Sequence, residues 1–225
     1  MGKKTIVFLA TLCMSLVLAC NAEAARQTRD LVFEEEPQPA AASTVNTQDT
    51  QVVAVKATIE LNRDGQISTV VPSHEFKSGD RVKLIYTPSI DGYAYWLAKG
   101  STGKTAILFP SAQAGSDNRI ERNKEYTIPA RGSFRFDDTV GKEELLCIIS
   151  AERVPELDKL IAENNQGVIP AESSAPVAKI EEKNTSKRQT RDLVFEEEET
   201  EDVVTKTQVA PKSEPFVTYF VLSHK

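Results

Sequence analysis

The sequence is poor in the residues that build disulfide-linked or metal-dependent proteins. It contains three cysteines, two histidines and one tryptophan in 225 residues. So few thiols and imidazoles exclude a disulfide-rich scaffold and argue against a structural zinc site, and we expect no metal and no cofactor. Positive charge is also not in excess. The formal net charge is −6, so we expect no nucleic acid among the partners.

The longest apolar run of the sequence lies near its first residue. Lys3 and Lys4 precede residues 5–19, which are uncharged and mostly apolar. This run is short for a membrane span and has the length of the apolar part of a secretory signal. We therefore interpret residues 1–24 as a signal peptide. An exported protein of the bacterial cell envelope is expected, either periplasmic or anchored to a membrane by lipid.

Two cleavage sites fit this signal. Residues 22–24 (Ala-Glu-Ala) have the small side chains that ordinary signal peptidase requires, and cleavage there follows Ala24. Residues 17–20 (Val-Leu-Ala-Cys) resemble a bacterial lipobox, in which cleavage precedes Cys20 and this cysteine is acylated. Each buried CH₂ group contributes about 0.8 kcal/mol, so several acyl chains hold a protein on a membrane. Both mature forms stay open, and Cys20 is the candidate lipidation site.

Composition divides the rest of the chain into zones. Residues 25–50 and 166–215 are polar and rich in proline and glutamate, so they bury too little apolar area to offset the entropy of ordering. We expect both to be flexible arms. Residues 51–165 hold most of the glycine turns and aromatic side chains and are expected to fold as one domain. The apolar residues 216–225 are predicted to return to that domain as a strand, with residues 53–61 as the candidate neighbour.

Alternating apolar residues predict β-strands throughout the central zone. Every second residue is apolar in residues 53–61, and the Asn-Arg-Asp-Gly sequence at 62–65 favours a hairpin turn. Apolar residues at helical spacing predict one helix over 154–165. The expected fold is mainly β: a single antiparallel β-sandwich or barrel-like domain with one C-terminal helix, flanked by disordered arms. Further strands are expected at 67–71, 82–86, 93–97, 106–109, 126–128, 134–136 and 145–149.

Short motifs in a fixed order resemble a known family. They are Gly-Asp-Arg-Val from residue 79, Asp-Gly-Tyr-Ala-Tyr from 91, Leu-Phe-Pro from 108, Tyr-Thr-Ile-Pro from 126 and Phe-Arg-Phe-Asp from 134. Over about residues 73–151 this set resembles the bacterial domain of unknown function 4384. The resemblance implies a compact β-rich module of bacterial envelope and signalling proteins. It implies no known reaction and no catalytic residues.

Residues 98–105 match a loose phosphate-binding pattern, Ala-Lys-Gly-Ser-Thr-Gly-Lys-Thr. Such a loop binds phosphate when a strand precedes it and a helix follows it. Residues 106–110 instead have the character of a strand that ends at a proline. We therefore predict a hairpin turn at this place and no nucleotide among the ligands.

Four acidic residues gather around Gly141. Paired carboxylates can carry acid–base chemistry or hold a calcium ion. Their spacing matches no EF-hand, and aspartates are common in turns because they bond to their own backbone. We expect a solvated turn and no enzyme, with catalysis as the weaker alternative. The four residues are Asp137, Asp138, Glu143 and Glu144.

Tyr93, Tyr95 and Trp96 are side chains of the kind that stack on sugars. Along a strand Tyr93 and Tyr95 share one face and Trp96 points to the other, so packing in the core is the expected role. Cys147 lies in an apolar run, and neither histidine has the context of a catalytic triad. A buried free thiol is therefore predicted at Cys147.

The strongest signal is an unchanged repeat. The eleven residues 26–36, Arg-Gln-Thr-Arg-Asp-Leu-Val-Phe-Glu-Glu-Glu, recur at 188–198. A basic head, an apolar centre and an acidic tail suit a short motif that adds as a strand to the sheet edge of a partner. A duplicated spacer without a selected role is the alternative. The candidate contact residues are Arg29, Leu31, Val32 and Phe33 in the first copy, and Arg191, Leu193, Val194 and Phe195 in the second.

These patterns favour a non-enzymatic cell-envelope protein whose β-domain is an interaction module. It presents two copies of a docking motif to another envelope protein. A glycan- or cell-wall-binding β-domain is the runner-up function, and an enzyme that uses the acidic turn is the weaker alternative.

Overall fold

The computed structural model describes residues 50–100, 103–164, 167–170, 173–189 and 195–225. The predicted signal peptide with Cys20 and the whole first copy of the repeat lie outside the described residues. Part of the second copy lies outside them as well. Seven of the eight candidate contact residues are therefore not described: Arg29, Leu31, Val32, Phe33, Arg191, Leu193 and Val194.

The described part of the chain is mainly β, as the alternating pattern predicts. Its two helices are α2 (Pro155–Glu163) and α3 (Ala175–Gln189). Among them and elsewhere in the described residues, no helix is long and apolar enough to span a bilayer. The strands are β1 (Thr50–Arg63), β2 (Gln66–Val70), β3 (Glu75–Phe76), β4 (Arg81–Pro88), β5 (Gly92–Lys99), β6 (Thr105–Phe109), β7 (Arg119–Ile120), β8 (Tyr126–Ile128), β9 (Phe134–Arg135), β10 (Gly141–Ser150), β11 (Val168–Ile169), β12 (Phe195–Glu199), β13 (Val204–Pro211) and β14 (Phe216–His224).

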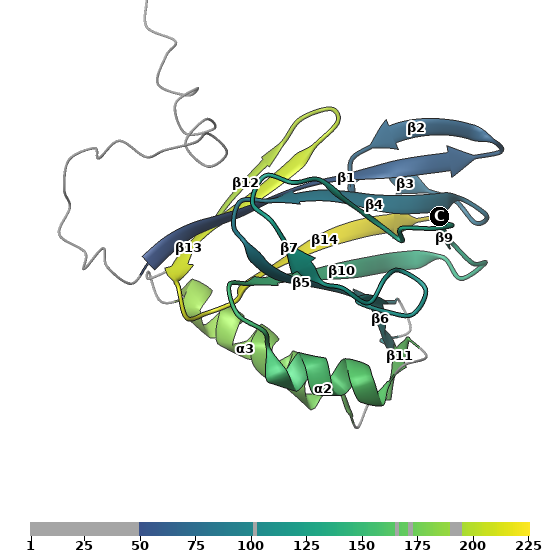
Figure 1. Cartoon of the computed structure of the whole chain (residues 1–225). Helices are drawn as coiled ribbons and strands as arrows, with labels where there is room; N and C mark the ends of the chain where they lie inside the picture. Colours follow the sequence, from purple (N-terminus) through teal and green to yellow (C-terminus); the bar gives the residue numbers. More distant parts are fainter. Residues whose placement is uncertain (1–49, 101–102, 165–166, 171–172, 190–194) are drawn as a thin grey trace, which may run out of the picture.

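The strands form two sheets that pack face to face, which confirms the predicted β-sandwich. Sheet A has the order β12-β13-β1-β4-β8, with β2 also beside β1 and β9 also beside β4. Sheet B has the order β11-β6-β5-β10-β14-β3, with β7 also beside β5. The described pairings are antiparallel except that β14 and β3 run parallel. Figure 1 shows sheet A above sheet B and both helices below sheet B.

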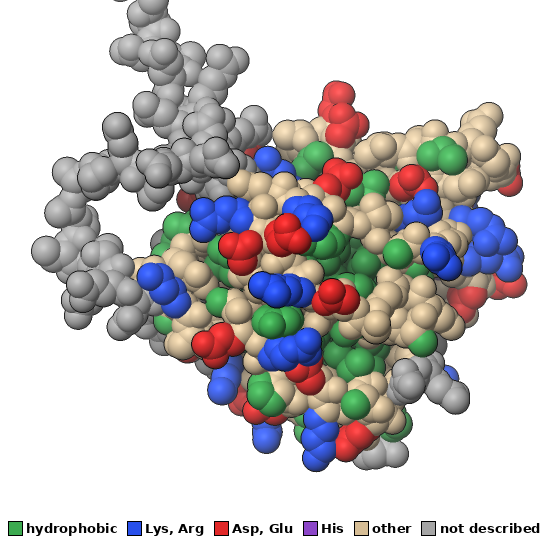
Figure 2. Space-filling model, in the orientation of Figure 1, with side chains coloured by type: hydrophobic (Ala, Val, Ile, Leu, Met, Phe, Trp, Pro, Cys, Tyr) green, Lys and Arg blue, Asp and Glu red, His purple; other side chains and the backbone are tan. Residues whose placement is uncertain are grey.

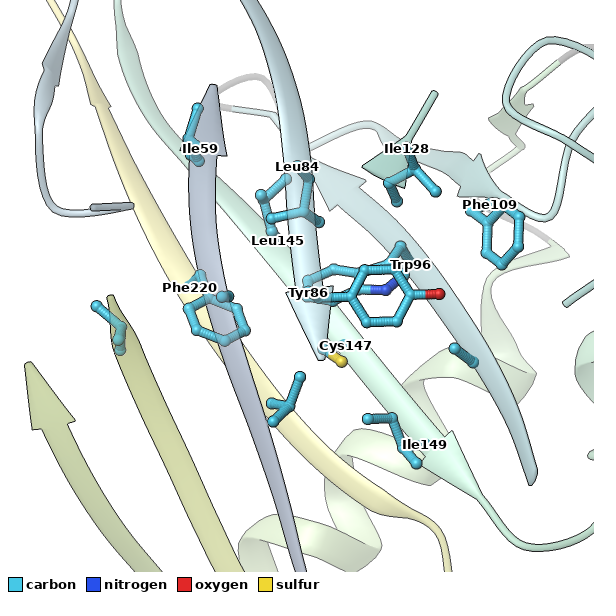
Figure 3. Close-up of a cluster of buried hydrophobic side chains, with 14 of the residues drawn as sticks. Ile59, Leu84, Tyr86, Trp96, Phe109, Ile128, Leu145, Cys147, Ile149 and Phe220 are labelled. Atoms are coloured by element: carbon cyan, nitrogen blue, oxygen red, sulfur yellow. The ribbon is translucent and has the colours of Figure 1, made fainter. Parts of the chain in front are cut away.

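The main core lies between the two sheets. The alternating residues of β1 all point into it, and each is no more than 3% exposed: Val53, Val55, Ala57, Ile59 and Leu61. Trp96 of β5 sits at its centre, with its ring centroid 5.2 Å from that of Tyr86 and 5.7 Å from that of Phe220 (Figure 3). These three large rings join β4 and β5 to β14, so the core holds both sheets together.

A second core lies between sheet B and the helices. Strands β5 and β10 are buried on both faces, because their alternate residues point away from the sandwich toward α2 and α3. Leu146 and Ile148 of β10 meet Leu157 and Leu160 of α2 there, and Val177 of α3 joins them. Helix α2 begins at a proline, where the missing N–H costs little.

The structure corrects the expectation of a flexible arm over residues 166–215. Helix α3, β12 and β13 all lie in that stretch, so the described part of the domain has two helices where one was predicted. Strand β13 pairs with β1 from Val204 to Pro211, and Val204 is buried in the main core. This order depends on pairing with a strand about 150 residues earlier in the chain, which the local composition does not reveal.

The C-terminal strand has neighbours that differ from the predicted one. Strand β14 pairs with β10 along its length and with β3 at its end. The place beside residues 53–61, which we expected β14 to take, is filled by β13, β2 and β4. Strand β14 therefore lies inside sheet B, opposite β1.

Candidate functional site

The hairpin of β12 and β13 brings the second copy of the repeat to the margin of sheet A. Strand β12 contains the last four residues of that copy and pairs antiparallel with β13, with Phe195 opposite Gln208 and Glu199 opposite Val204. Among the described strands, β13 is the sole neighbour of β12. The other edge of β12 is therefore open in the described part of sheet A, and we call it the β12 edge.

Lys206 is the charged centre of this hairpin. Its side chain is only 10% exposed, and its Nζ lies 2.9 Å from Oε2 of Glu197, the residue directly opposite on β12. The same Nζ lies 5.2 Å from the ring centroid of the buried Phe220. A nearly buried ammonium is costly unless a carboxylate or an aromatic face compensates for lost water. Glu197 thus supplies the charge that lets Lys206 lie against the core.

Side-chain contacts hold the hairpin against β1 and the loop after β2. Oγ1 of Thr58 lies 2.6 Å from the carbonyl oxygen of Asp202 and 3.0 Å from that of Val70, and its single proton serves one of them at a time. The Ser73 hydroxyl donates to Oε1 of Glu199 at 2.6 Å. Within the turn, the backbone N–H of Thr200 donates to the carbonyl oxygen of Val203 at 2.9 Å. These contacts fix the register of β12.

The β12 edge is strongly acidic. Four consecutive glutamates, Glu196 to Glu199, are exposed on it, and the acidic side chains at the top of Figure 2 stand over the tip of the same hairpin. Like charges on an edge strand disfavour pairing with a second copy of that strand. An extended segment that carries lysine or arginine is the neighbour that this edge favours.

The structure places the second copy of the repeat in sheet A by its acidic tail. Phe195 is the one predicted contact residue within the described part, and it is the first residue of β12. From the sequence, the apolar centre and one arginine of each copy were the expected contact residues, and the pair of Glu197 with Lys206 was not singled out. The pattern that could have indicated this pair is the alternation of Val204, Lys206 and Gln208. It predicts a strand only if the polar side chains of Lys206 and Gln208 are allowed to point inward.

A second feature is an open pocket of about 280 Å³ at one end of the sandwich, between β4 and β9 on one side and β10 and β14 on the other. His224 lines it, is itself buried, and has its Nε2 3.1 Å from Oγ of Ser78. The other lining residues are apolar or charged: Ile59, Val82, Lys83, Leu84, Ala98, Leu108, Phe134, Arg135, Phe136, Asp137, Glu143, Leu145 and Leu222.

The predicted acidic turn is divided by the structure. Asp137 and Glu143 line the pocket, whereas Glu144 follows Glu143 on a strand and so points to the other face of sheet B. Asp137 also accepts a 2.7 Å hydrogen bond from the backbone N–H of Thr139, as expected of an aspartate in a turn. Within the described residues, no group of three or more His, Cys, Asp and Glu could hold a metal ion.

The phosphate-loop pattern forms the predicted hairpin. The backbone N–H of Gly103 donates to the carbonyl oxygen of Gly100 at 2.8 Å, and that of Gly100 donates to Lys104 at 3.0 Å. Strand β6 follows the turn, so the helix N-terminus that a phosphate-binding loop uses is missing from this described segment. Residues 101–102 lie outside the described residues.

The aromatic residues and Cys147 pack as the strand pattern predicts. Trp96 is fully buried between the sheets, and Tyr95 is fully buried on the opposite face. The Tyr95 hydroxyl donates to Oδ1 of Asp158 at 3.0 Å and accepts from the backbone N–H of Val154 at 3.1 Å, which ties α2 to sheet B. Trp96 and Tyr95 are therefore closed to a sugar, whereas Tyr93 is half-buried and has the guanidinium of Arg153 over its ring, 4.8 Å from the centroid. Cys147 is a buried free thiol, and burial raises its pKa.

Comparison with known proteins identifies the central part of the chain. Residues 75–153 match the model of the family described as Domain of unknown function (DUF4384), which confirms the resemblance seen in the sequence. The match runs from β3 to the end of β10 and leaves β1, β12, β13 and β14 outside. No curated protein and no solved structure matches the chain.

Proposed function

We propose that this chain is a non-enzymatic interaction protein of the bacterial cell envelope, and that its β-sandwich presents the repeated segment as an edge strand to other proteins. The observation that supports this proposal is the β12 edge, where the acidic tail of the second copy has one neighbour among the described strands. An edge strand offers unpaired N–H and C=O groups to an incoming extended segment. The repeat then supplies both the backbone and the charge for recognition.

The chemistry of the edge indicates the partner. Glu196 and Glu198 point to the face of β12 opposite to Glu197, because side chains alternate along a strand. A partner strand with lysine or arginine at alternate positions would place its cations opposite these carboxylates. Each opposite-charge pair across strands contributes about 0.2–1 kcal/mol, and salt screens it. The partner is therefore an extended basic segment of another envelope protein, bound in a salt-sensitive way.

Export and anchoring belong to the same proposal. Residues 1–24 direct the chain out of the cytoplasm, and an acylated Cys20 holds it on a membrane. The Cys20→Ser variant should then move the exported protein from the membrane fraction to the soluble fraction. A mature N-terminus at Ala25 would instead show cleavage after Ala24 and would overturn the lipid anchor.

Capture from envelope extracts tests the binding role. The full chain is the bait, and the variant Glu196→Lys/Glu198→Lys reverses two charges of the β12 edge while it leaves the ion pair of Glu197 with Lys206 in place. Its matched control, Glu125→Lys/Asp138→Lys, makes the same change in net charge at exposed positions near β8 and β9, on the side of sheet A far from β12. The same proteins should be captured by wild type and control, and lost with the edge variant and with 0.5 M salt. Equal capture by both variants would refute the proposal.

A second candidate function is ligand binding in the pocket at the end of the sandwich. The observation that favours it is the position of Asp137 and Glu143 beside an apolar floor. A small amphipathic molecule with a cationic group would place its apolar part against Leu145 and its charge beside these carboxylates. Titration with short alkylamines should raise the melting temperature of the wild type and not of Asp137→Asn/Glu143→Gln. No shift in the wild type would exclude this ligand class.

A further inference from the structure

We propose that the edge of β13 is a shared acceptor for both copies of the repeat, and that residues 33–36 of the same chain bind β13 in place of Phe195–Glu198. This inference deepens the proposed function, since it rests on the repeat acting as an edge strand. Residues 33–36 pair with β13 whenever the second copy leaves it. One copy is then held by the domain while the other is presented to a partner.

The identity of the two copies sets the register. Phe33 takes the place of Phe195 opposite Gln208, and Glu35 takes the place of Glu197 opposite Lys206. The backbone pairing of β12 with β13 and the ion pair of Glu197 with Lys206 at 2.9 Å are thus available to the first copy without change. A slip by one residue would turn Glu35 to the other face, so it would not reproduce the ion pair that Glu197 forms with Lys206.

The β13 edge needs an occupant. If β12 left, Lys206 would lose its ion pair with Glu197 while its ammonium lies against Phe220 near the core, 5.2 Å from the ring centroid. Glu197 is 46% exposed, so the pair is only half-buried, but losing it still removes a carboxylate from an ammonium that has little access to water. Displacement of β12 is therefore coupled to its replacement by a segment with glutamate at the same register. Residues 33–36 carry that glutamate.

The open side of β12 does not suit the first copy. Pairing of residues 33–36 with β12 itself would set a run of three glutamates beside Glu196 to Glu199. Like charges directly opposite in neighbouring strands are destabilising. Of the two places along this hairpin, the acceptor for the first copy is therefore β13.

The tether between the first copy and the domain is long enough. In the proposed register Glu36 lies beside Thr205, whereas Thr50 pairs with Pro211 on the other side of β13. The path crosses six residues along the strand and two strand spacings, about 22 Å. Residues 37–49 number 13 and span up to about 43 Å when extended. The first copy would run parallel to β1, and such a connection needs about a dozen residues.

The residues that directly follow the repeat differ between the two copies, and this difference favours the second copy as the neighbour of β13. Pro37 stands where the second copy has Glu199, so the first copy cannot accept the hydrogen bond that Ser73 donates to Glu199. It also lacks the tight turn after β12, which places the second copy next to β13 at high effective concentration. The second copy is therefore the resting occupant, and the first copy replaces it when it is weakened or captured.

Disulfide trapping in the purified full chain tests this exchange. Cysteines at Glu34 and Thr207 face each other only if residues 33–36 occupy β13, because Glu196 is opposite Thr207 in the resting hairpin. The matched control pairs Glu35→Cys with Thr207→Cys, which is out of register by one residue. Both pairs are made with Cys13 and Cys20 replaced by serine, so that the buried Cys147 is the only other thiol.

The variant Glu197→Lys penalises the second copy and leaves the first unchanged. Intramolecular trapping of the 34–207 pair should rise by about tenfold or more in this background, while the control pair stays low. The variant Glu199→Pro, which copies the Pro37 of the first copy, should raise trapping in the same direction if Glu197→Lys fails to fold. The charge exchange Lys206→Glu/Glu197→Lys should lower 34–207 trapping below the wild-type level, because Glu35 then meets a glutamate. Adding Glu35→Lys should return trapping to the wild-type level.

Three results would overturn the inference. They are absence of 34–207 trapping in both weakened backgrounds while Trp96 fluorescence reports a folded core, equal trapping of the control pair, and a disulfide-linked dimer in place of the intramolecular product. The assay contains only the purified chain, so failure to find an envelope partner does not affect it. Loss of trapping, in turn, leaves the capture experiment untouched.

Discussion

Replacement of Asp80 by asparagine should destabilise the domain more than replacement of an exposed charge in a turn would. Asp80 lies in a turn between β3 and β4, yet it is only 3% exposed. Its two carboxylate oxygens accept hydrogen bonds from Nε of Arg63 at 2.9 Å and from a terminal guanidinium nitrogen of Arg63 at 2.6 Å. One of them also accepts from the backbone N–H of Lys77 at 2.8 Å. The carboxylate therefore joins the β1–β2 hairpin to the turn before β4.

The magnitude follows from burial and charge. Breaking a fully buried ion pair costs about 3–5 kcal/mol, and we lower this to about 2–3 kcal/mol because Arg63 is one-third exposed. For a domain of this size, that loss should lower the melting temperature by about 5–10 °C. Urea and thermal unfolding, followed by fluorescence of the single buried Trp96, measure it at pH 7.

Acid should remove the difference between wild type and Asp80→Asn. The hydrogen bond from Arg63 lowers the pKa of Asp80 below its ordinary value of 3.8, and the bond from the Lys77 backbone acts in the same direction. A carboxylate whose pKa is depressed by folding stabilises the native state above its unfolded pKa, and this stabilisation is lost as the pH falls through the folded pKa. The gap between the two proteins should therefore be constant at neutral pH and shrink below about pH 4.

An exposed ion pair serves as the control for this experiment. Glu75 and Lys225 form an ion pair at a similar distance, 2.7 Å, but both side chains are more than half exposed. Glu75→Gln should thus change stability far less than Asp80→Asn. Two results would refute the reasoning: unfolding of Asp80→Asn within about 0.5 kcal/mol of wild type, or a gap that does not shrink in acid.

Three further predictions use other contacts of the fold. Thr218→Val should stabilise by about 1 kcal/mol in urea unfolding, because the Thr218 hydroxyl is fully buried without a partner, whereas Thr58→Val should destabilise by a similar amount since its hydroxyl holds the β12–β13 hairpin. Tyr95→Phe should speed hydrogen exchange in the first turn of α2, measured by mass spectrometry, while exchange in β10 stays slow. Cys147 should react with thiol reagents only at denaturant concentrations that also shift Trp96 fluorescence, since burial raises its pKa and blocks access.

Local patterns in the sequence predicted much of the central domain. The apolar alternation of β1 needed no knowledge of its neighbours, because a half-buried strand shows its inward face directly. The turn after β1 was equally clear, since Asp64 and Gly65 both have positive φ, at 55° and 85°, as a tight hairpin requires. The opposite faces of Tyr95 and Trp96 followed from the period of two. Each of these inferences depends on residues within a few positions of one another.

The β12 edge depends on pairing between residues far apart in the sequence and was missed. Lys206 and Gln208 are polar, so β13 reads as part of a flexible segment until it is paired with β1 and Lys206 meets Glu197. Helix α3 was missed for a related reason. Its polar and apolar residues do not separate into faces along the sequence, although Val177 and Asn184 are buried against the rest of the domain. The repeat itself was visible as identity, but its place in a sheet was not.

The position of β14 has a consequence for how the chain is made. This strand comes after all the other described elements in the chain, but it lies in the interior of sheet B between β10 and β3 and contributes Phe220 to the packing of Trp96. While residues 216–224 have not yet emerged from the ribosome, β10 lacks one of its two neighbours and the apolar face of β1 lacks part of its cover. The strands that are synthesised earlier then remain without this neighbour, and their apolar surface stays accessible to chaperones. Closure becomes a late, single event that follows release of the last strand.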